Sequence, residues 1–85
     1  MNEELEIFKK KLLYRASYRG TKEMDILLSS FVNKYIDSFD ENLLNELNDF
    51  LNYEDEIILN FYQKSIIKKK IDKNKISKIY KQFNL

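Results

Sequence analysis

The 85-residue sequence contains no cysteine, histidine, proline or tryptophan, and it has a single glycine. The lack of cysteine excludes disulfides, thiolate metal sites and cysteine nucleophiles. The lack of histidine removes the most common general base and metal ligand. One glycine cannot build a glycine-rich phosphate loop, and no serine–lysine spacing stands out. We therefore expect a protein that is not an enzyme and has no catalytic, metal-binding or cofactor-binding residue.

Positive and negative charges nearly balance, with a net charge of +1, but they are unevenly distributed. Residues 37–56 carry acidic and no basic side chains, whereas residues 64–81 carry eight lysines and one acid, Asp72. Each block is either a solvated surface or a docking face, and the basic block could also attract RNA or a membrane. The alternative function is therefore a small helical nucleic-acid- or ribosome-associated protein. The near-neutral total and the absence of arginine from residues 64–81 argue against it.

The location is predicted from hydropathy and from the first residues. No hydrophobic run approaches the roughly 20 residues that span a bilayer. Residues 1–6 are acidic, unlike a secretory signal or an organelle presequence. The bias toward lysine, asparagine and isoleucine is typical of an AT-rich, bacterial coding sequence. These features predict a soluble protein of the bacterial-type cytoplasm.

Hydrophobic residues recur at intervals of three and four, the period of amphipathic helices, and no segment alternates as a strand would. Residues 24–35 show the clearest stripe and predict the central core helix. The predicted helices cover residues 2–18, 22–36, 41–51, 55–64 and a last segment that starts near residue 72 or 74. Lysines 68–70 form a basic connector. The fold class is therefore all-α, a single compact bundle of about five short helices in one domain, residues 1–85.

Short polar residues that precede the predicted helices are candidate amino-terminal caps. Thr21 suits the second helix, Ser38 or Asp40 the third, and Asp72 or Asn74 the fifth. The carboxylates around residues 54–56 are interpreted in the same way, as caps and solvated faces.

The stretch from Arg19 to Glu23 is the strongest candidate for a functional site. Arg15 and Arg19 are the only arginines in a lysine-rich chain, and Arg19 precedes the only glycine, Gly20. Arginine offers a planar fork of donors where lysine offers a point charge. In the simpler interpretation, Gly20 ends a helix in the left-handed conformation, the arginine is solvated, and Glu23 and Asp25 complement a helix dipole. In the functional one, Arg19 and Glu23 project from a tight turn and insert into a partner.

Residues 18–28, which read YRGTKEMDILL and are followed by Phe31, resemble the signature of the succinate dehydrogenase flavinylation-factor family (the SdhE type). That family is marked by Arg-Gly-x-x-Glu at the end of the first of five helices, commonly continuing to an aspartate. Residues 55–62, DEIILNFY, are similar to the fourth helix of the family. The departures are Phe61 for a frequent tryptophan, Thr21 for the usual methionine, and Tyr18 for a common basic residue.

The resemblance implies an assembly factor or chaperone that binds the flavoprotein subunit of succinate dehydrogenase, or of fumarate reductase. Such proteins promote covalent attachment of FAD to a histidine of the partner. The resemblance implies that Arg19, Gly20 and Glu23 form the contact surface, with Asp25 steadying Arg19 or the helix start. Arg15 is a further candidate partner-binding residue, because it is the only other arginine and lies four residues before Arg19. The chain itself would bind no cofactor and would act on FAD held by the partner. We expect a monomer when free, with no nucleic acid partner and no membrane insertion.

Overall fold

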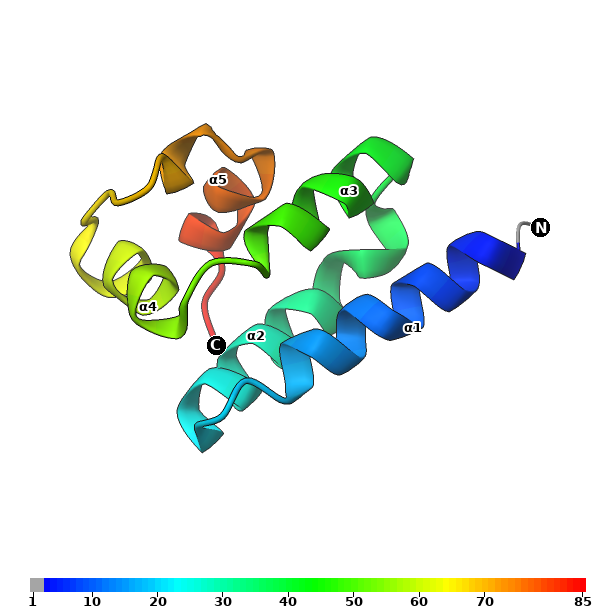
Figure 1. Cartoon of the computed structure of the whole chain (residues 1–85), viewed down its shortest axis with the longest axis horizontal. Coiled ribbons are helices and arrows are strands. Elements are labelled where there is room, and N and C mark those ends of the chain that lie inside the picture. Colours follow the sequence, from blue (N-terminus) through cyan, green and yellow to red (C-terminus); the bar gives the residue numbers. More distant parts are fainter. Residues whose placement is uncertain (1–2) are drawn as a thin grey trace.

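Five α-helices and two short 3-10 helices make up the computed structural model, which describes residues 3–85 (Figure 1). The elements are α1 (Glu3–Ser17), α2 (Lys22–Tyr35), η1 (Ile36–Ser38), α3 (Glu41–Phe50), α4 (Asp55–Lys64), η2 (Ile71–Lys73) and α5 (Lys75–Gln82). No strand occurs in this range, so the predicted all-α fold with five short helices is confirmed. None of these helices is long and apolar enough to cross a membrane.

The predicted boundaries agree with the structure to within about one turn. Asn2, where the first helix was predicted to start, lies outside the described residues. Thr21 caps α2 by accepting a hydrogen bond from the amide of Met24 at 3.3 Å. Asp40 rather than Ser38 caps α3. Asn74 rather than Asp72 caps α5, which starts at the next residue because a 3-10 turn precedes it.

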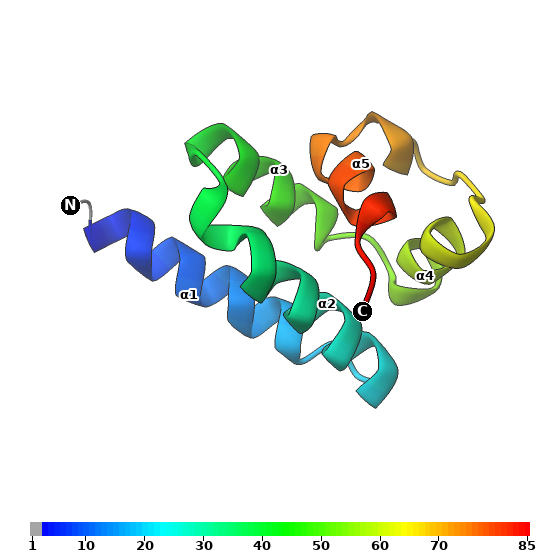
Figure 2. The same ribbon diagram turned by 180° about the vertical axis from the view of Figure 1, so that it is seen from behind.

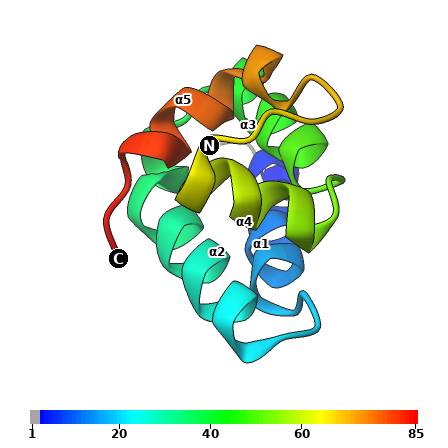
Figure 3. The ribbon, with the colours of Figure 1, turned by 90° about the vertical axis from the view of Figure 1, so that its left-hand side faces the viewer.

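The helices form two halves that pack across a common core. α1 and α2 run antiparallel, side by side, as a hairpin (Figures 1 and 2). α3 packs on α1 and on α5, and α5 in turn packs on α4. Viewed from the side, the α1–α2 turn lies at the end of the molecule opposite the segment before α5 (Figure 3). The hairpin and the α3–α5 half therefore meet along one interface, which any contact from the α1–α2 turn to α3 or α4 will strengthen.

The core contains the hydrophobic stripes that the sequence pattern marked. Each of the five α-helices contributes fully buried side chains. The largest of these are Tyr80, Phe31, Phe50, Leu12, Leu28, Leu44, Leu47, Leu51, Ile58, Ile71, Ile76 and Val32. The ring of Tyr80 lies 5.1 Å from that of Phe31 and 5.2 Å from that of Phe50, both in edge-on geometry. An aromatic cluster therefore joins α2, α3 and α5.

The Tyr80 hydroxyl is an exception within this core, because it is buried without a hydrogen-bond partner among residues 3–85. Burial, and then the neighbouring Tyr62, raise the pKa of Tyr80 above its ordinary value of 10.0. We expect Tyr80→Phe to increase the free energy of unfolding by about 1 kcal/mol, since it removes an unpaired buried polar group. The measurement is urea unfolding at neutral pH. A variant less stable than the wild type would contradict the prediction.

The raised pKa also predicts how this contribution depends on pH. A group whose pKa is higher in the folded state contributes stability that is complete below its unfolded pKa and is lost as pH rises above it. The wild type should therefore lose stability above about pH 10, and Tyr80→Phe should lose less over the same range. Tyr62→Phe is the matched control. The Tyr62 hydroxyl donates a hydrogen bond to the carbonyl of Phe83, so its removal should destabilise the protein.

Candidate partner-binding site

The turn between α1 and α2 covers residues 18–21 and has a backbone that only glycine adopts readily. Gly20 has a φ of +121°, outside the left-handed helical range that was predicted for it. It also lies beyond the end of α1 rather than closing that helix. No atom lies within 4 Å of the place where a Cβ would be, so the turn is open on this side. Gly20 is therefore required by backbone conformation, and it leaves its backbone accessible.

A hydrogen bond between Arg19 and Asp25 closes the α1–α2 turn. A side-chain oxygen of Asp25 accepts a hydrogen bond from the backbone amide of Arg19. The Asp25 side chain thus gives a partner to the amide of Arg19, which lies two residues beyond the end of α1, and it ties that end to the start of α2. This agrees with the expectation that Asp25 steadies Arg19.

The Arg19 side chain turns inward and is 11% exposed. Its Nε donates to a carboxylate oxygen of Asp55 at 2.8 Å. Its Nη1 and Nη2 donate to the carbonyl oxygens of Leu51 and Tyr53, each at 2.7 Å. Leu51 and Tyr53 lie in the segment that joins α3 to α4, and Asp55 is the first residue of α4. One guanidinium therefore fastens the α1–α2 hairpin to the other half of the molecule.

Arg15 makes a second link to the end of α3. Its guanidinium donates to the backbone carbonyl and the side-chain oxygen of Asn48, and to the side-chain oxygen of Asn52 at 2.7 Å. Burial lowers the pKa of Arg15 below its ordinary value, and the nearby charge of Arg19 lowers the pKa further. Both arginines approach the carboxyl end of α3, where a positive charge is favourable against the helix dipole. Arginine is needed at these positions because a lysine could not reach several divergent acceptors at once.

The structure thus corrects the idea that Arg19 projects from the turn into a partner, because all three of its nitrogens already bond within the chain. Asp25 is also directed inward. Glu23 differs from both. It is exposed in the first turn of α2, and its side chain makes no hydrogen bond or ion pair within residues 3–85. The predicted residues do gather at one turn, where Arg15, Arg19 and Asp25 hold the backbone and Gly20 and Glu23 are presented to solvent.

Asp55 was missed by the sequence analysis, which interpreted it as a cap or part of a solvated face. Its side chain is 27% exposed and pairs with Arg19. It stands in the first turn of α4, where the helix dipole also favours a carboxylate. The presence of Arg19 in a lysine-rich chain indicated that an acceptor for its guanidinium exists. Nothing in the sequence, however, distinguishes Asp55 from its acidic neighbours Glu54 and Glu56.

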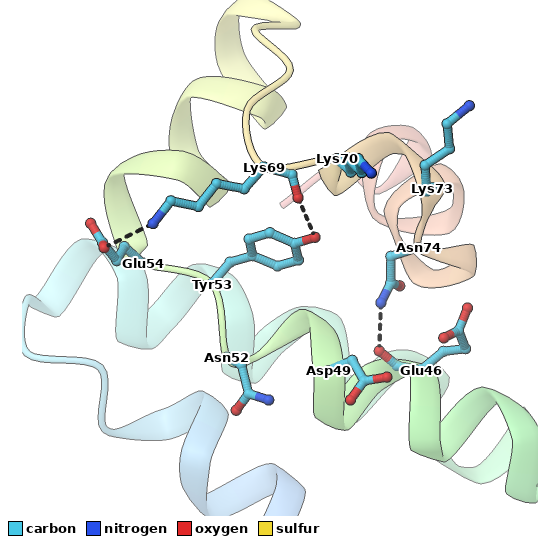
Figure 4. Close-up of a pocket in the computed structure, with 9 residues that line it drawn as sticks. All are labelled: Glu46, Asp49, Asn52, Tyr53, Glu54, Lys69, Lys70, Lys73 and Asn74. Carbon is cyan, nitrogen blue, oxygen red and sulfur yellow. Dashed lines mark hydrogen bonds and ion pairs between the residues drawn. The ribbon is translucent and has the colours of Figure 1, made fainter.

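A cleft of about 540 Å³ lies apart from this turn, between α3 and the segment before α5 (Figure 4). It is lined by Glu46, Asp49, Asn52, Tyr53, Glu54, Lys69, Lys70, Lys73 and Asn74. The Tyr53 hydroxyl donates to the carbonyl of Lys69 at 2.9 Å, and Lys69 Nζ lies 3.5 Å from a Glu54 oxygen. The Lys73 side chain is directed away from the cleft (Figure 4). Oppositely charged residues therefore partly satisfy one another here.

The fold and the site together define a small all-α protein whose principal motif is a rigid, partly exposed turn between its first two helices. The profile of the family described as the flavinator of succinate dehydrogenase matches residues 10–84. The chain therefore belongs to this family, and the resemblance drawn from residues 18–28 and 55–62 is confirmed.

Several relatives named as assembly factors match part of the chain. Succinate dehydrogenase assembly factor 2-B, mitochondrial, of Drosophila ananassae is 53% identical over 38 residues, covering 45% of this chain and 23% of the relative. Succinate dehydrogenase assembly factor 2, mitochondrial, of Scheffersomyces stipitis is 40% identical over 53 residues, covering 62% of this chain and 36% of the relative. The matched segment thus spans about a quarter to a third of these relatives. No solved structure matches the chain significantly.

These relatives correct the prediction of a bacterial-type cytoplasmic location, which is wrong. The relatives from Drosophila ananassae, Drosophila grimshawi and Scheffersomyces stipitis are all named as mitochondrial proteins. The prediction was based on the acidic first residues and on the bias toward lysine, asparagine and isoleucine, and both are features of composition. Composition alone does not identify a compartment.

Proposed function

We propose that this protein binds the flavoprotein subunit of succinate dehydrogenase, or of a fumarate reductase, and promotes covalent attachment of FAD to it. Membership of the flavinator family and the names of the matched assembly factors support this proposal. In the proposal the FAD and the histidine that it joins belong to the partner. The chain has no histidine or cysteine. It therefore acts by binding, and it does not perform the bond-forming step.

The observation that carries the proposal is that some residues of the α1–α2 turn bond within the chain whereas others are exposed. Arg19 and Asp25 use their side chains within the chain, so they determine the shape of the turn. Gly20 has an open backbone, and Glu23 has an exposed carboxylate with no internal partner among the described residues. Gly20 and Glu23 are therefore the proposed direct contacts, and Arg15, Arg19 and Asp25 are positioning residues.

A rigid turn suits this role for an energetic reason. Side chains and backbone that are already ordered lose little conformational entropy when a complex forms. An exposed carboxylate costs little before binding and gives specificity when it meets a complementary group. The proposed mechanism is that the bound factor favours a conformation of the flavoprotein in which flavin and histidine are close enough to react.

The test is co-expression of the chain with a candidate flavoprotein subunit in cells that lack their own factor. Covalent flavin is measured as ultraviolet fluorescence of the denatured flavoprotein band. We expect the band to fluoresce strongly with the chain and weakly without it. Equal fluorescence in the two cultures would overturn the proposed function for that flavoprotein. Binding of the two purified proteins, measured by calorimetry, provides a readout that is independent of the chemistry.

A further inference from the structure

The connector between α4 and η2, residues 65–70, exposes two adjacent isoleucines that the proposed function does not use. Ile66 is 39% exposed and Ile67 is 55% exposed. They are followed directly by Lys68–Lys70, all of them exposed. Adjacent large hydrophobic side chains on a protruding connector lose favourable burial, so their exposure calls for a partner with an apolar component.

The backbone holds this connector in a defined shape at both ends. Ser65 ends α4 in the left-handed conformation, and its amide donates to the carbonyl of Phe61 at 3.1 Å. Lys69 and Lys70 also have positive φ angles, of 52° and 59°. The Tyr53 hydroxyl binds the carbonyl of Lys69 and braces this second strained point. Strain of this kind persists only where surrounding contacts impose it, so the isoleucines are presented by a shaped loop rather than by a loose one.

Lysines surround the connector and continue over α5. All eight lysines of residues 64–81 are exposed. A hollow of about 410 Å³ is lined by Lys73, Lys75 and Lys78 together with Asp72 and Asn74. The facing acids are partly engaged already, since Glu54 pairs with Lys69 and a Glu46 oxygen accepts from the amide of Lys75 at 3.1 Å. The surface therefore keeps an excess of positive charge next to a hollow large enough for an anionic headgroup.

We propose that the connector and the lysine-bearing face of η2 and α5 form a docking surface for an anionic lipid bilayer. The lysines would lie at the headgroups, and Ile66 and Ile67 would enter the boundary between headgroups and acyl chains. A nucleic acid fits less well. The segment has no arginine for bidentate contacts, and its exposed hydrophobic groups are aliphatic and cannot stack on bases in the way that aromatic rings do.

The position of this surface is compatible with simultaneous binding of a protein partner. Figures 1 and 3 place the segment before α5 at the upper edge of the molecule and the α1–α2 turn at the lower edge. A bilayer at the connector would leave Gly20 and Glu23 uncovered. The membrane proposal rests on the connector and on the lysine-bearing face of η2 and α5, and it stands or falls independently of the proposed function.

The first test is sedimentation of the full chain with vesicles of phosphatidylcholine alone and of an equimolar mixture of phosphatidylcholine and phosphatidylserine. We expect binding to the anionic vesicles only, weakening as salt increases. Ile66→Ser with Ile67→Ser should weaken it severalfold. Ile7→Ser with Ile26→Ser is the matched control, because these isoleucines are similarly exposed, at 52% and 45%, on other elements. That control should bind as the wild type does.

The second test removes two positive charges, either from the proposed surface or from α1. Lys75→Gln with Lys78→Gln should lower the partition coefficient by roughly fivefold for each lysine. Lys10→Gln with Lys11→Gln carries the same change in net charge on α1 and should have a much smaller effect. Equal binding to both kinds of vesicle, or equal effects of each variant and its control, would overturn the proposal. Lysine-dependent binding to single-stranded RNA without vesicle binding would also overturn it and would assign the surface to nucleic acid.

Discussion

Arg19→Ala is expected to lower the free energy of unfolding by roughly 3 kcal/mol, a large fraction of the stability of a domain this small. The substitution removes three hydrogen bonds and leaves the Asp55 carboxylate and the carbonyls of Leu51 and Tyr53 without their donor. An unpaired, mostly buried carboxylate is costly. The matching fall in melting temperature is roughly 15 °C, measured by circular dichroism.

Two further variants separate the charge of Arg19 from its geometry. Arg19→Lys can keep the pairing with Asp55 but loses the fork, so about half of the destabilisation should remain. A double-mutant cycle of Arg19→Ala with Asp55→Ala should show a favourable coupling energy of about 1 kcal/mol or more. If Arg19→Ala melts at the wild-type temperature, the guanidinium does not hold the two halves together.

Glu23→Ala is expected to reduce covalent flavin on the partner by at least about tenfold, the effect of removing one interface contact worth about 1.4 kcal/mol. It should change stability by less than about 0.5 kcal/mol, because the side chain is exposed and has no partner within residues 3–85. The measurement combines the flavin fluorescence of the co-expressed partner with thermal melts of the purified variant.

Glu56→Ala is the matched control for this prediction. Glu56 is exposed and is the second residue of α4, as Glu23 is the second residue of α2. Both substitutions remove one carboxylate from the positive end of a helix, so their effects on the helix dipole should be similar. Only Glu23→Ala should lose flavin attachment. Equal loss in the two variants would show that general charge, rather than the α1–α2 turn, governs the interaction.

Comparing these variants distinguishes contact from positioning. Arg19→Ala should lose both stability and flavin attachment, whereas Glu23→Ala should lose attachment alone. Asp55→Ala offers an intermediate case, since Asp55 lies outside the Arg-Gly-x-x-Glu motif and pairs with Arg19. If an Arg19 variant is as stable as the wild type but does not support flavinylation, Arg19 contacts the partner directly.

The positions of the helices, the candidate caps and the location of the motif follow from the order of the residues alone. Thr21, Asp40 and Asn74 cap helices through atoms two or three residues away. The spacing of hydrophobic residues likewise depends on neighbours within one or two turns. Such local relations are written directly in the order of the residues. The family signature also lies within a short stretch, and for the same reason it could be found before the fold was known.

The roles of the two arginines depend on contacts between distant parts of the chain. The partners of the Arg19 guanidinium lie between 32 and 36 residues away, and those of the Arg15 guanidinium between 33 and 37. Two acceptors of Arg19 are backbone carbonyls, which every residue carries, so no residue type could mark Leu51 or Tyr53 in advance. The sequence showed that a guanidinium was needed near Gly20. Packing of the α1–α2 hairpin against α3 and α4 turned it inward, because that is where the unpaired carbonyls at the end of α3 and the Asp55 carboxylate are found.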